Sequence, residues 1–143
     1  MALPPRHLFA SLIVATISLL FDQKTPFFSV ELFGHNFTVF VLCLGFGVLL
    51  DVDHIIDFRV NRYNHFENLE SQFQKGRMYV VLHGVENTLL LTVLAILFPF
   101  LLFPAISYDC HIAMDIYYND VSFEAYFYVI RFGRKFVHSR QYS

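Results

Sequence analysis

The sequence contains no tryptophan, only two cysteines and few charged residues. Charged side chains make up 15% of the 143 residues, against roughly a quarter in soluble globular domains. Cys43 and Cys110 lie in separate apolar stretches and form no CxxC pair. Neither a disulfide framework nor a thiolate zinc site is therefore indicated. No glycine-rich phosphate loop and no GxSxG motif occurs, which argues against nucleotide binding and serine-nucleophile chemistry.

Hydrophobic residues dominate what is present, at 56% of the chain with 18 phenylalanines. A soluble domain of this length has too much surface to bury so many apolar side chains. We therefore expect an all-α integral membrane bundle of about four transmembrane helices, forming a single membrane domain over residues 1–143. The expected helices cover about 7–21, 36–57, 78–98 and 105–119, and an aromatic and basic segment over about 121–136 is expected to lie in the lipid headgroup region.

The basic residues are distributed unevenly along this arrangement. With four spans, Lys24 alone faces one side and the other nine lysines and arginines face the opposite side. The positive-inside rule then places both termini and the 58–77 connector in the cytoplasm. The expected protein is multi-pass, with membrane lipid as its partner. A net charge of −2 gives no indication of a nucleic-acid partner.

Three clusters of ionisable side chains interrupt the apolar runs. An unpaired charge in a bilayer costs on the order of 2.5 kcal/mol or more, so each cluster needs partners. Taken singly, the clusters also fit a solvated helix end, a satisfied core histidine or a hydrogen-bonded seam between helices. In each cluster the side chains fall on one helical face or arc. The clusters are Asp51, Asp53, His54 and Asp57; His83, Glu86 and Asn87; and His111, Asp115 and Asn119.

The topology predicts that these clusters meet. A hairpin turning near Pro99 and Pro104 places Glu86 and Asp115 at about the same depth, and the DVDHIID segment leaves the membrane on the same side. Imidazoles and carboxylates suit Zn²⁺ or Mn²⁺ better than a soft metal. Glu86 is the expected general base, with Asp57 next in line. The predicted metal ligands are Asp51, Asp53, His54, His83, His111 and Asp115.

Three motifs, in this order, carry a family resemblance: LDVDH at 50–54, HGVEN at 83–87 and HIAMD at 111–115. The chain resembles, over about residues 40 to 120, the bacterial inner-membrane proteins known as membrane-bound metal-dependent hydrolases, whose signature is roughly PDxDH, an HRGxTHS-type motif and HLLLD. The resemblance implies about four helices, a metal-dependent hydrolase and a location in the bacterial inner (cytoplasmic) membrane. The sequence departs from the signature at Leu50, which replaces a proline, and at Glu86 or Asn87, which stand where a second histidine is absent.

The expected function is therefore a metal-dependent hydrolase at the cytoplasmic membrane face, acting on a phosphoester or another lipid headgroup bond. The alternative is a non-enzymatic integral membrane protein in which the polar cluster or its metal stabilises the bundle or a complex. An ion or proton pathway is disfavoured, because the outer halves of the expected spans hold almost no polar residues. No site role is assigned to the remaining histidines, which lack a carboxylate at helical spacing: His7, His35, His65 and His138.

Overall fold

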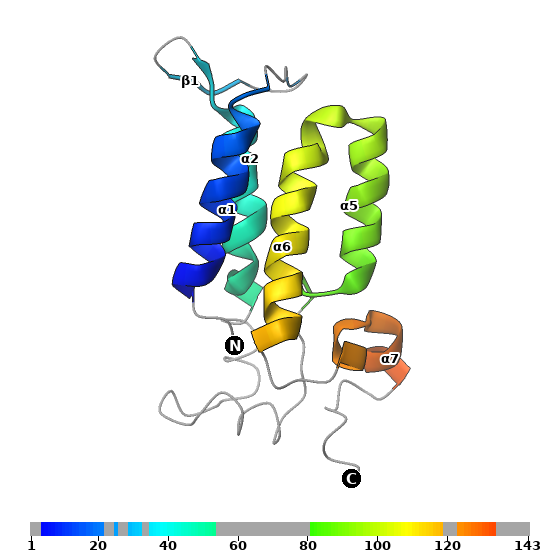
Figure 1. The fold of residues 1–143 in the computed structure, drawn as a ribbon. Helices are drawn as coiled ribbons and strands as arrows, with labels where there is room; N and C mark the ends of the chain where they lie inside the picture. Colours follow the sequence, from blue (N-terminus) through cyan, green and yellow to red (C-terminus); the bar gives the residue numbers. More distant parts are fainter. Residues whose placement is uncertain are drawn as a thin grey trace.

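The computed structural model of the protein describes residues 4–21, 25, 29–32, 35–53, 81–118 and 123–133. Within these ranges the chain is mostly helical (Figure 1). The elements, in chain order, are α1 (Pro4–Ser18), β1 (Glu31–Leu32), β2 (His35–Asn36), α2 (Thr38–Val48), the 3₁₀ turn η1 (Leu49–Asp51), α5 (Val85–Leu97), η2 (Pro99–Leu101), α6 (Leu102–Tyr118), η3 (Phe123–Tyr126) and α7 (Tyr128–Gly133).

The four long helices lie side by side, with α6 in contact with α1, α2 and α5 (Figure 1). Successive helices run in opposite directions. The start of α1, the end of α2, the start of α5 and the end of α6 therefore lie at one end of the bundle, near α7 (Figure 1). The antiparallel β1–β2 pair, with Glu31 opposite Asn36, lies at the other end. Residues far apart in the sequence are thus brought together at the α7 end.

Small side chains allow α1, α2 and α6 to approach one another closely. A Cβ atom added at Gly47 of α2 would overlap the hydroxyl oxygens of both Ser11 on α1 and Ser107 on α6. The Ser107 hydroxyl donates a hydrogen bond to the Cys43 carbonyl at 2.8 Å, which joins α6 to α2. The buried face of α1 follows helical spacing and consists of His7, Ser11, Val14, Ala15 and Ser18.

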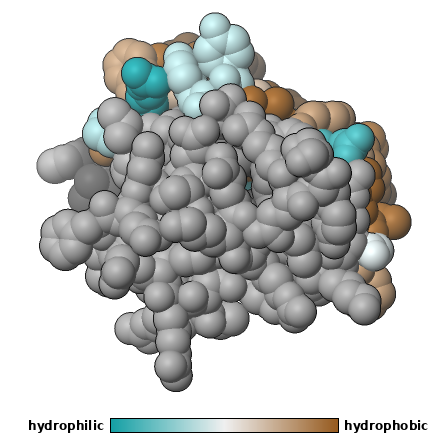
Figure 2. Space-filling view, turned by 90° about the horizontal axis from the view of Figure 1, so that it is seen from below, coloured by the Kyte–Doolittle hydropathy of each residue, from teal (hydrophilic) through white to brown (hydrophobic). Residues whose placement is uncertain are grey.

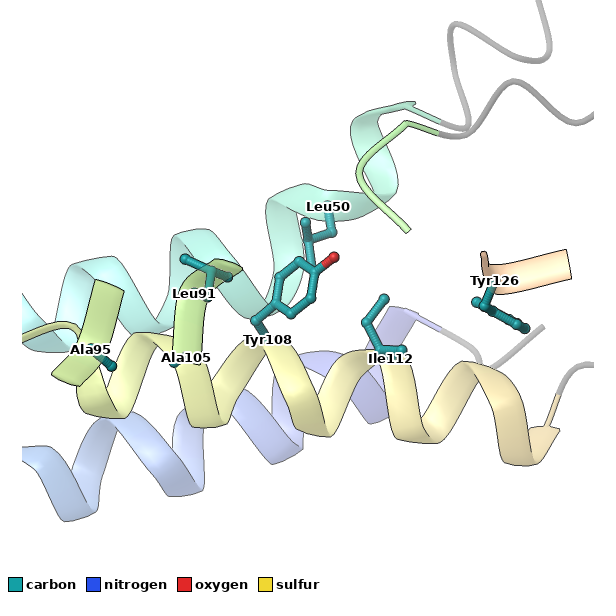
Figure 3. Close-up of a cluster of buried hydrophobic side chains, with 7 residues drawn as sticks. All are labelled: Leu50, Leu91, Ala95, Ala105, Tyr108, Ile112 and Tyr126. Carbon is teal, nitrogen blue, oxygen red and sulfur yellow. The ribbon is translucent and has the colours of Figure 1, made fainter. Parts of the chain in front are cut away.

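A second contact region joins α6 to α5 and to the turns at the α7 end. The Tyr108 hydroxyl donates to the Leu82 carbonyl at 2.6 Å and lies 3.1 Å from the Gly84 carbonyl, so it holds the segment that precedes α5. Figure 3 shows this tyrosine within a hydrophobic cluster formed by Leu50, Leu91, Ala95, Ala105, Tyr108, Ile112 and Tyr126.

The prediction of an integral membrane bundle is wrong for the residues that the structure describes, since no helix among them has both the length and the apolar character that a membrane crossing needs. The longest of these helices, α6, has 17 residues. It spans about 26 Å at 1.5 Å per residue, whereas a bilayer core is about 30 Å thick. The inner-membrane location and the cytoplasmic orientation inferred from four spans are overturned by the same finding.

Two of the expected spans are too long, because an apolar run does not reveal where the helical backbone breaks. The third expected helix, 78–98, begins only at Val85, because Gly84 has an extended backbone with φ −115° and ψ 139°. The second, 36–57, gives way after Val48 to the η1 turn. Many large hydrophobic side chains are nonetheless exposed, and some are seen at the edge of the view in Figure 2. On α5 they include Leu89, Leu90, Val93, Ile96 and Leu97.

The segment expected in the headgroup region, 121–136, instead packs against the bundle. Its described part forms η3 and α7. Arg131 is buried, and its Nη2 atom donates a hydrogen bond to the His83 carbonyl at 3.1 Å. This cation therefore points into the protein, and residues 134–136 lie outside the described residues.

Candidate metal centre

Four side chains from three parts of the chain converge at the α7 end of the bundle: His83 before α5, His111 and Asp115 on α6, and Asp51 in η1. The His83 Nε2 atom lies 3.0 Å from His111 Nε2, 3.3 Å from Asp115 Oδ2 and 3.6 Å from Asp51 Oδ1. The His111 Nε2 atom lies 3.3 Å from the same Asp115 oxygen and 3.5 Å from the same Asp51 oxygen. Two nitrogen and two oxygen atoms therefore face a common centre.

Five of the six separations among these atoms are close to the edge length of a metal-coordination tetrahedron. Bonds of about 2.0–2.1 Å from Zn²⁺ to imidazole nitrogen and carboxylate oxygen place neighbouring ligand atoms about 3.3–3.4 Å apart. The five distances run from 3.0 to 3.6 Å. Neither oxygen of the buried Asp115 carboxylate has a hydrogen bond of acceptable geometry among the described residues. The atoms thus have the spacing of metal ligands, and the Asp115 oxygens are placed as ligands rather than as hydrogen-bond acceptors.

The outer nitrogens of the two imidazoles show which atoms face the centre. His111 Nδ1 lies 2.8 Å from the Gly47 carbonyl oxygen, which can only accept, so this nitrogen carries the hydrogen. His83 Nδ1 lies 3.1 Å from Oδ1 and 3.2 Å from Oδ2 of Asp53, and it donates to that carboxylate. In both neutral rings the Nε2 lone pair is then directed inward. The two Nε2 atoms are 3.0 Å apart, and because their lone pairs repel each other, a proton or a cation is needed between them.

The structure places Asp53, one of the predicted ligands, behind His83 rather than at the centre. Its Oδ2 atom accepts a hydrogen bond from the Leu82 backbone N–H at 2.6 Å, and the same carboxylate receives His83 Nδ1. A carboxylate in this position fixes the orientation of a metal-binding histidine and raises its basicity. Its role is to position His83.

The cluster carries complementary charge in the absence of a metal. Burial opposes the charged form of His83, but hydrogen bonds to Asp51 and Asp53 and the charges of Asp53 and Asp115 raise its pKa to about 9. Burial likewise opposes the ionised form of Asp115. The close contacts with His111 and His7 and the charges of His111 and His83 prevail, and they hold the Asp115 pKa well below its usual range. At neutral pH a proton on His83 therefore competes with any cation for the centre.

The exposure of the four residues indicates where the centre is accessible. The side chains of His111, Asp115 and His83 are 0%, 1% and 3% exposed, whereas that of Asp51 is 28% exposed. Asp51 is therefore the most exposed of the four side chains.

His7, which sequence reasoning left without a role, lies at the same centre. His7, Asp51, His111 and Asp115 form a group, buried except at Asp51, whose ligand atoms all lie within 4.8 Å of one another and could hold a metal ion. The His7 ring stacks on that of His111, with centroids 3.9 Å apart. The alternating direction of successive helices could have indicated this position, because it places the start of the first helix at the same end as the three motifs.

The other predicted residues lie elsewhere or outside the described ranges. His54 and Asp57 belong to residues that the structure does not describe. Glu86 lies near α7, where its Oε1 atom accepts a 3.3 Å hydrogen bond from the Val129 N–H, and its role as a general base stays a prediction. The neighbouring Asn87 donates to the Tyr128 hydroxyl at 2.6 Å.

No family model, curated protein or solved structure matches this chain. The chemistry of the site therefore has to be inferred from its own residues. Two imidazoles and two carboxylates around one centre, with a third imidazole beside them, form a donor set of borderline and hard ligands.

Proposed function

We propose that the protein is a metal-dependent hydrolase that holds Zn²⁺ or Mn²⁺ between His83, His111, Asp51 and Asp115 and acts on phosphoesters. One observation carries the proposal: four ligand atoms converge with five separations of 3.0 to 3.6 Å, while the outer nitrogens of both imidazoles are held by Gly47 and Asp53. The motif resemblance to metal-dependent hydrolases supports the choice of reaction.

A bound divalent cation would polarise a scissile phosphoester and lower the pKa of a water molecule toward about 7. The residues of the chain supply the positioning. The two histidines present neutral nitrogens to the cation, the two carboxylates balance its charge, and the exposed side of Asp51 is where substrate enters. Glu86 is the proposed acceptor of the proton that the attacking water loses.

A structural metal site is the second candidate, and the depth of burial favours it. Side chains that are 0%, 1% and 3% exposed leave little room for a substrate on three sides. A closed structural site uses four protein ligands, whereas a catalytic site keeps one position for water or substrate. In the structural case the cation would join α6, η1 and the segment before α5 without turning over a substrate.

Metal analysis and hydrolysis assays on purified protein separate these proposals. We expect wild type to retain a transition metal through desalting and to hydrolyse a chromogenic phosphomonoester or phosphodiester, and His111→Ala to lose both properties. Glu86→Gln is expected to keep its metal and its melting temperature but to lose hydrolysis. If metal-loaded wild type cleaves nothing in a broad phosphoester panel, the hydrolase proposal is wrong and the structural metal site remains. If wild type binds no metal, both proposals are wrong.

A further inference from the structure

The imidazole of His7 is fully buried beside the metal centre. The residue is 1% exposed, and neither ring nitrogen has a hydrogen bond of acceptable geometry in the described part of the chain. Leaving a buried polar group unsatisfied is unfavourable, so native proteins nearly always provide it with a partner. Its Nε2 atom lies 3.3 Å from Asp115 Oδ1.

Asp115 turns its two oxygens toward different imidazoles. Oδ1 faces His7, whereas Oδ2 lies 3.3 Å from both His83 Nε2 and His111 Nε2. The carboxylate is 1% exposed, and neither oxygen receives a well-directed hydrogen bond within the described residues. A buried carboxylate placed in this way has the arrangement of a bridge between two cations.

The separation between the stacked His7 and His111 rings matches the separation of the ions in two-metal sites. The ring centroids are 3.9 Å apart and the planes differ by 25°, so the two rings face the carboxylate nearly in parallel. Metal ions in two-metal hydrolytic sites lie about 3.5–4 Å apart. Two parallel imidazoles at this spacing, each directed at its own oxygen of one carboxylate, can each bind a separate ion.

We propose that a second divalent cation binds between His7 Nε2 and Asp115 Oδ1, next to the ion assigned above, on whose presence this inference rests. Asp51 belongs to the same group of ligand atoms within 4.8 Å, so its carboxylate supplies the third protein ligand. The remaining positions of this ion are open to water or substrate. Two divalent cations joined by two carboxylates carry excess positive charge, which a phosphoester anion neutralises.

Mn²⁺ is the probe for the test, because its electron paramagnetic resonance signal distinguishes an isolated ion from a coupled pair. Titration of purified wild type is expected to saturate at about two Mn²⁺ per chain, with the broadened signal of a coupled pair. His7→Phe keeps a ring stacked on His111 but has no ligand atom. It is expected to bind about one Mn²⁺, with the signal of an isolated ion. Ser11→Ala, one turn further along the buried face of α1, is the matched control and keeps both ions.

The number of Mn²⁺ ions bound by wild type decides the question even if His7→Phe folds poorly. His7→Asn is a second variant for the same measurement. One Mn²⁺ in both wild type and His7→Phe would overturn the second site and leave the proposed function standing. Loss of all Mn²⁺ in a folded His7→Phe would make His7 a ligand of a single ion and would also overturn the pair. No Mn²⁺ or Zn²⁺ in wild type would overturn the inference together with the proposed function.

Discussion

The carboxylate of Asp53 lies 3.1 Å from Nδ1 of His83 and is itself held by the Leu82 N–H. This contact determines which nitrogen of His83 faces the centre. The imidazole would otherwise be free to turn or to change tautomer, and either change would remove a ligand atom from the site.

Asp53→Ala is therefore expected to weaken metal binding by about 10–100-fold without removing any ligand. Competition titration with a chelator measures the change. Asp109→Ala is the matched control. Asp109 is a half-buried carboxylate of α6 whose pKa is raised by burial, and the group of potential metal ligands does not include it. An equal loss of affinity in both variants would show that Asp53 acts only through general stability.

The pH dependence of metal binding follows from His83. Because its pKa is raised from 6.5 to about 9, a proton must leave Nε2 before a cation binds. Apparent affinity should rise about tenfold per pH unit up to that pKa and then level off. Calorimetric titration from mildly acidic to mildly basic pH measures this. Affinity that does not change with pH would exclude His83 as a ligand.

The metal-free protein should show the opposite trend. A raised pKa means that folding favours the protonated imidazole, so the stabilisation from His83 is complete below about 6.5 and is lost as the pH rises through about 9. Thermal unfolding in a chelator should therefore give a falling melting temperature across this window. His83→Ala should flatten the fall, and an unchanged slope in that variant would assign the effect to another group.

Gly47→Ala should disrupt both the helix contact and the site. The added methyl group would overlap the hydroxyls of Ser11 and Ser107, and its displacement would shift the carbonyl that accepts His111 Nδ1. We expect a loss of about 1–3 kcal/mol in the free energy of unfolding, together with weaker metal binding. Gly45→Ala is the control, because no atom lies within 4 Å of its added Cβ. It should stabilise α2 by up to about 0.5–1 kcal/mol. Equal changes in the free energy of unfolding for the two variants would show that the contact of Gly47 with Ser11 and Ser107 is not the cause.

Arg131→Gln should loosen the segment that carries His83. Its guanidinium donates to the His83 carbonyl from a buried position and lies over the Tyr128 ring, 4.7 Å from the centroid. Loss of a charged hydrogen bond in this setting costs about 1.5–3 kcal/mol, measurable by urea unfolding. Arg6→Gln is the matched control, because Arg6 lies over Tyr118 at 4.4 Å but is exposed. A comparable loss in both variants would show that the contact with His83 contributes nothing.

Local spacing within the sequence determined part of the site. The four-residue interval between His111 and Asp115 places both on one face of any helix. The hairpin turning between Pro99 and Pro104 then returns α6 alongside α5, so His83 and His111 meet across it, with ring centroids 5.0 Å apart. These relationships depend on the residue spacing within a helix and on the position of a turn, and both can be recognised in a single sequence.

Tertiary structure alone decided the rest. The lengths of α2 and α5 depended on backbone breaks after Val48 and at Gly84, which the apolar pattern conceals, and the spans predicted over 36–57 and 78–98 were too long for that reason. The inclusion of His7, 44 residues before Asp51 in sequence, depended on α1 packing closely against α2 and α6. That closeness comes from Gly47 meeting Ser11 and Ser107. Contacts between helices arise from the fit of side chains on different elements, and no interval within one element encodes that fit.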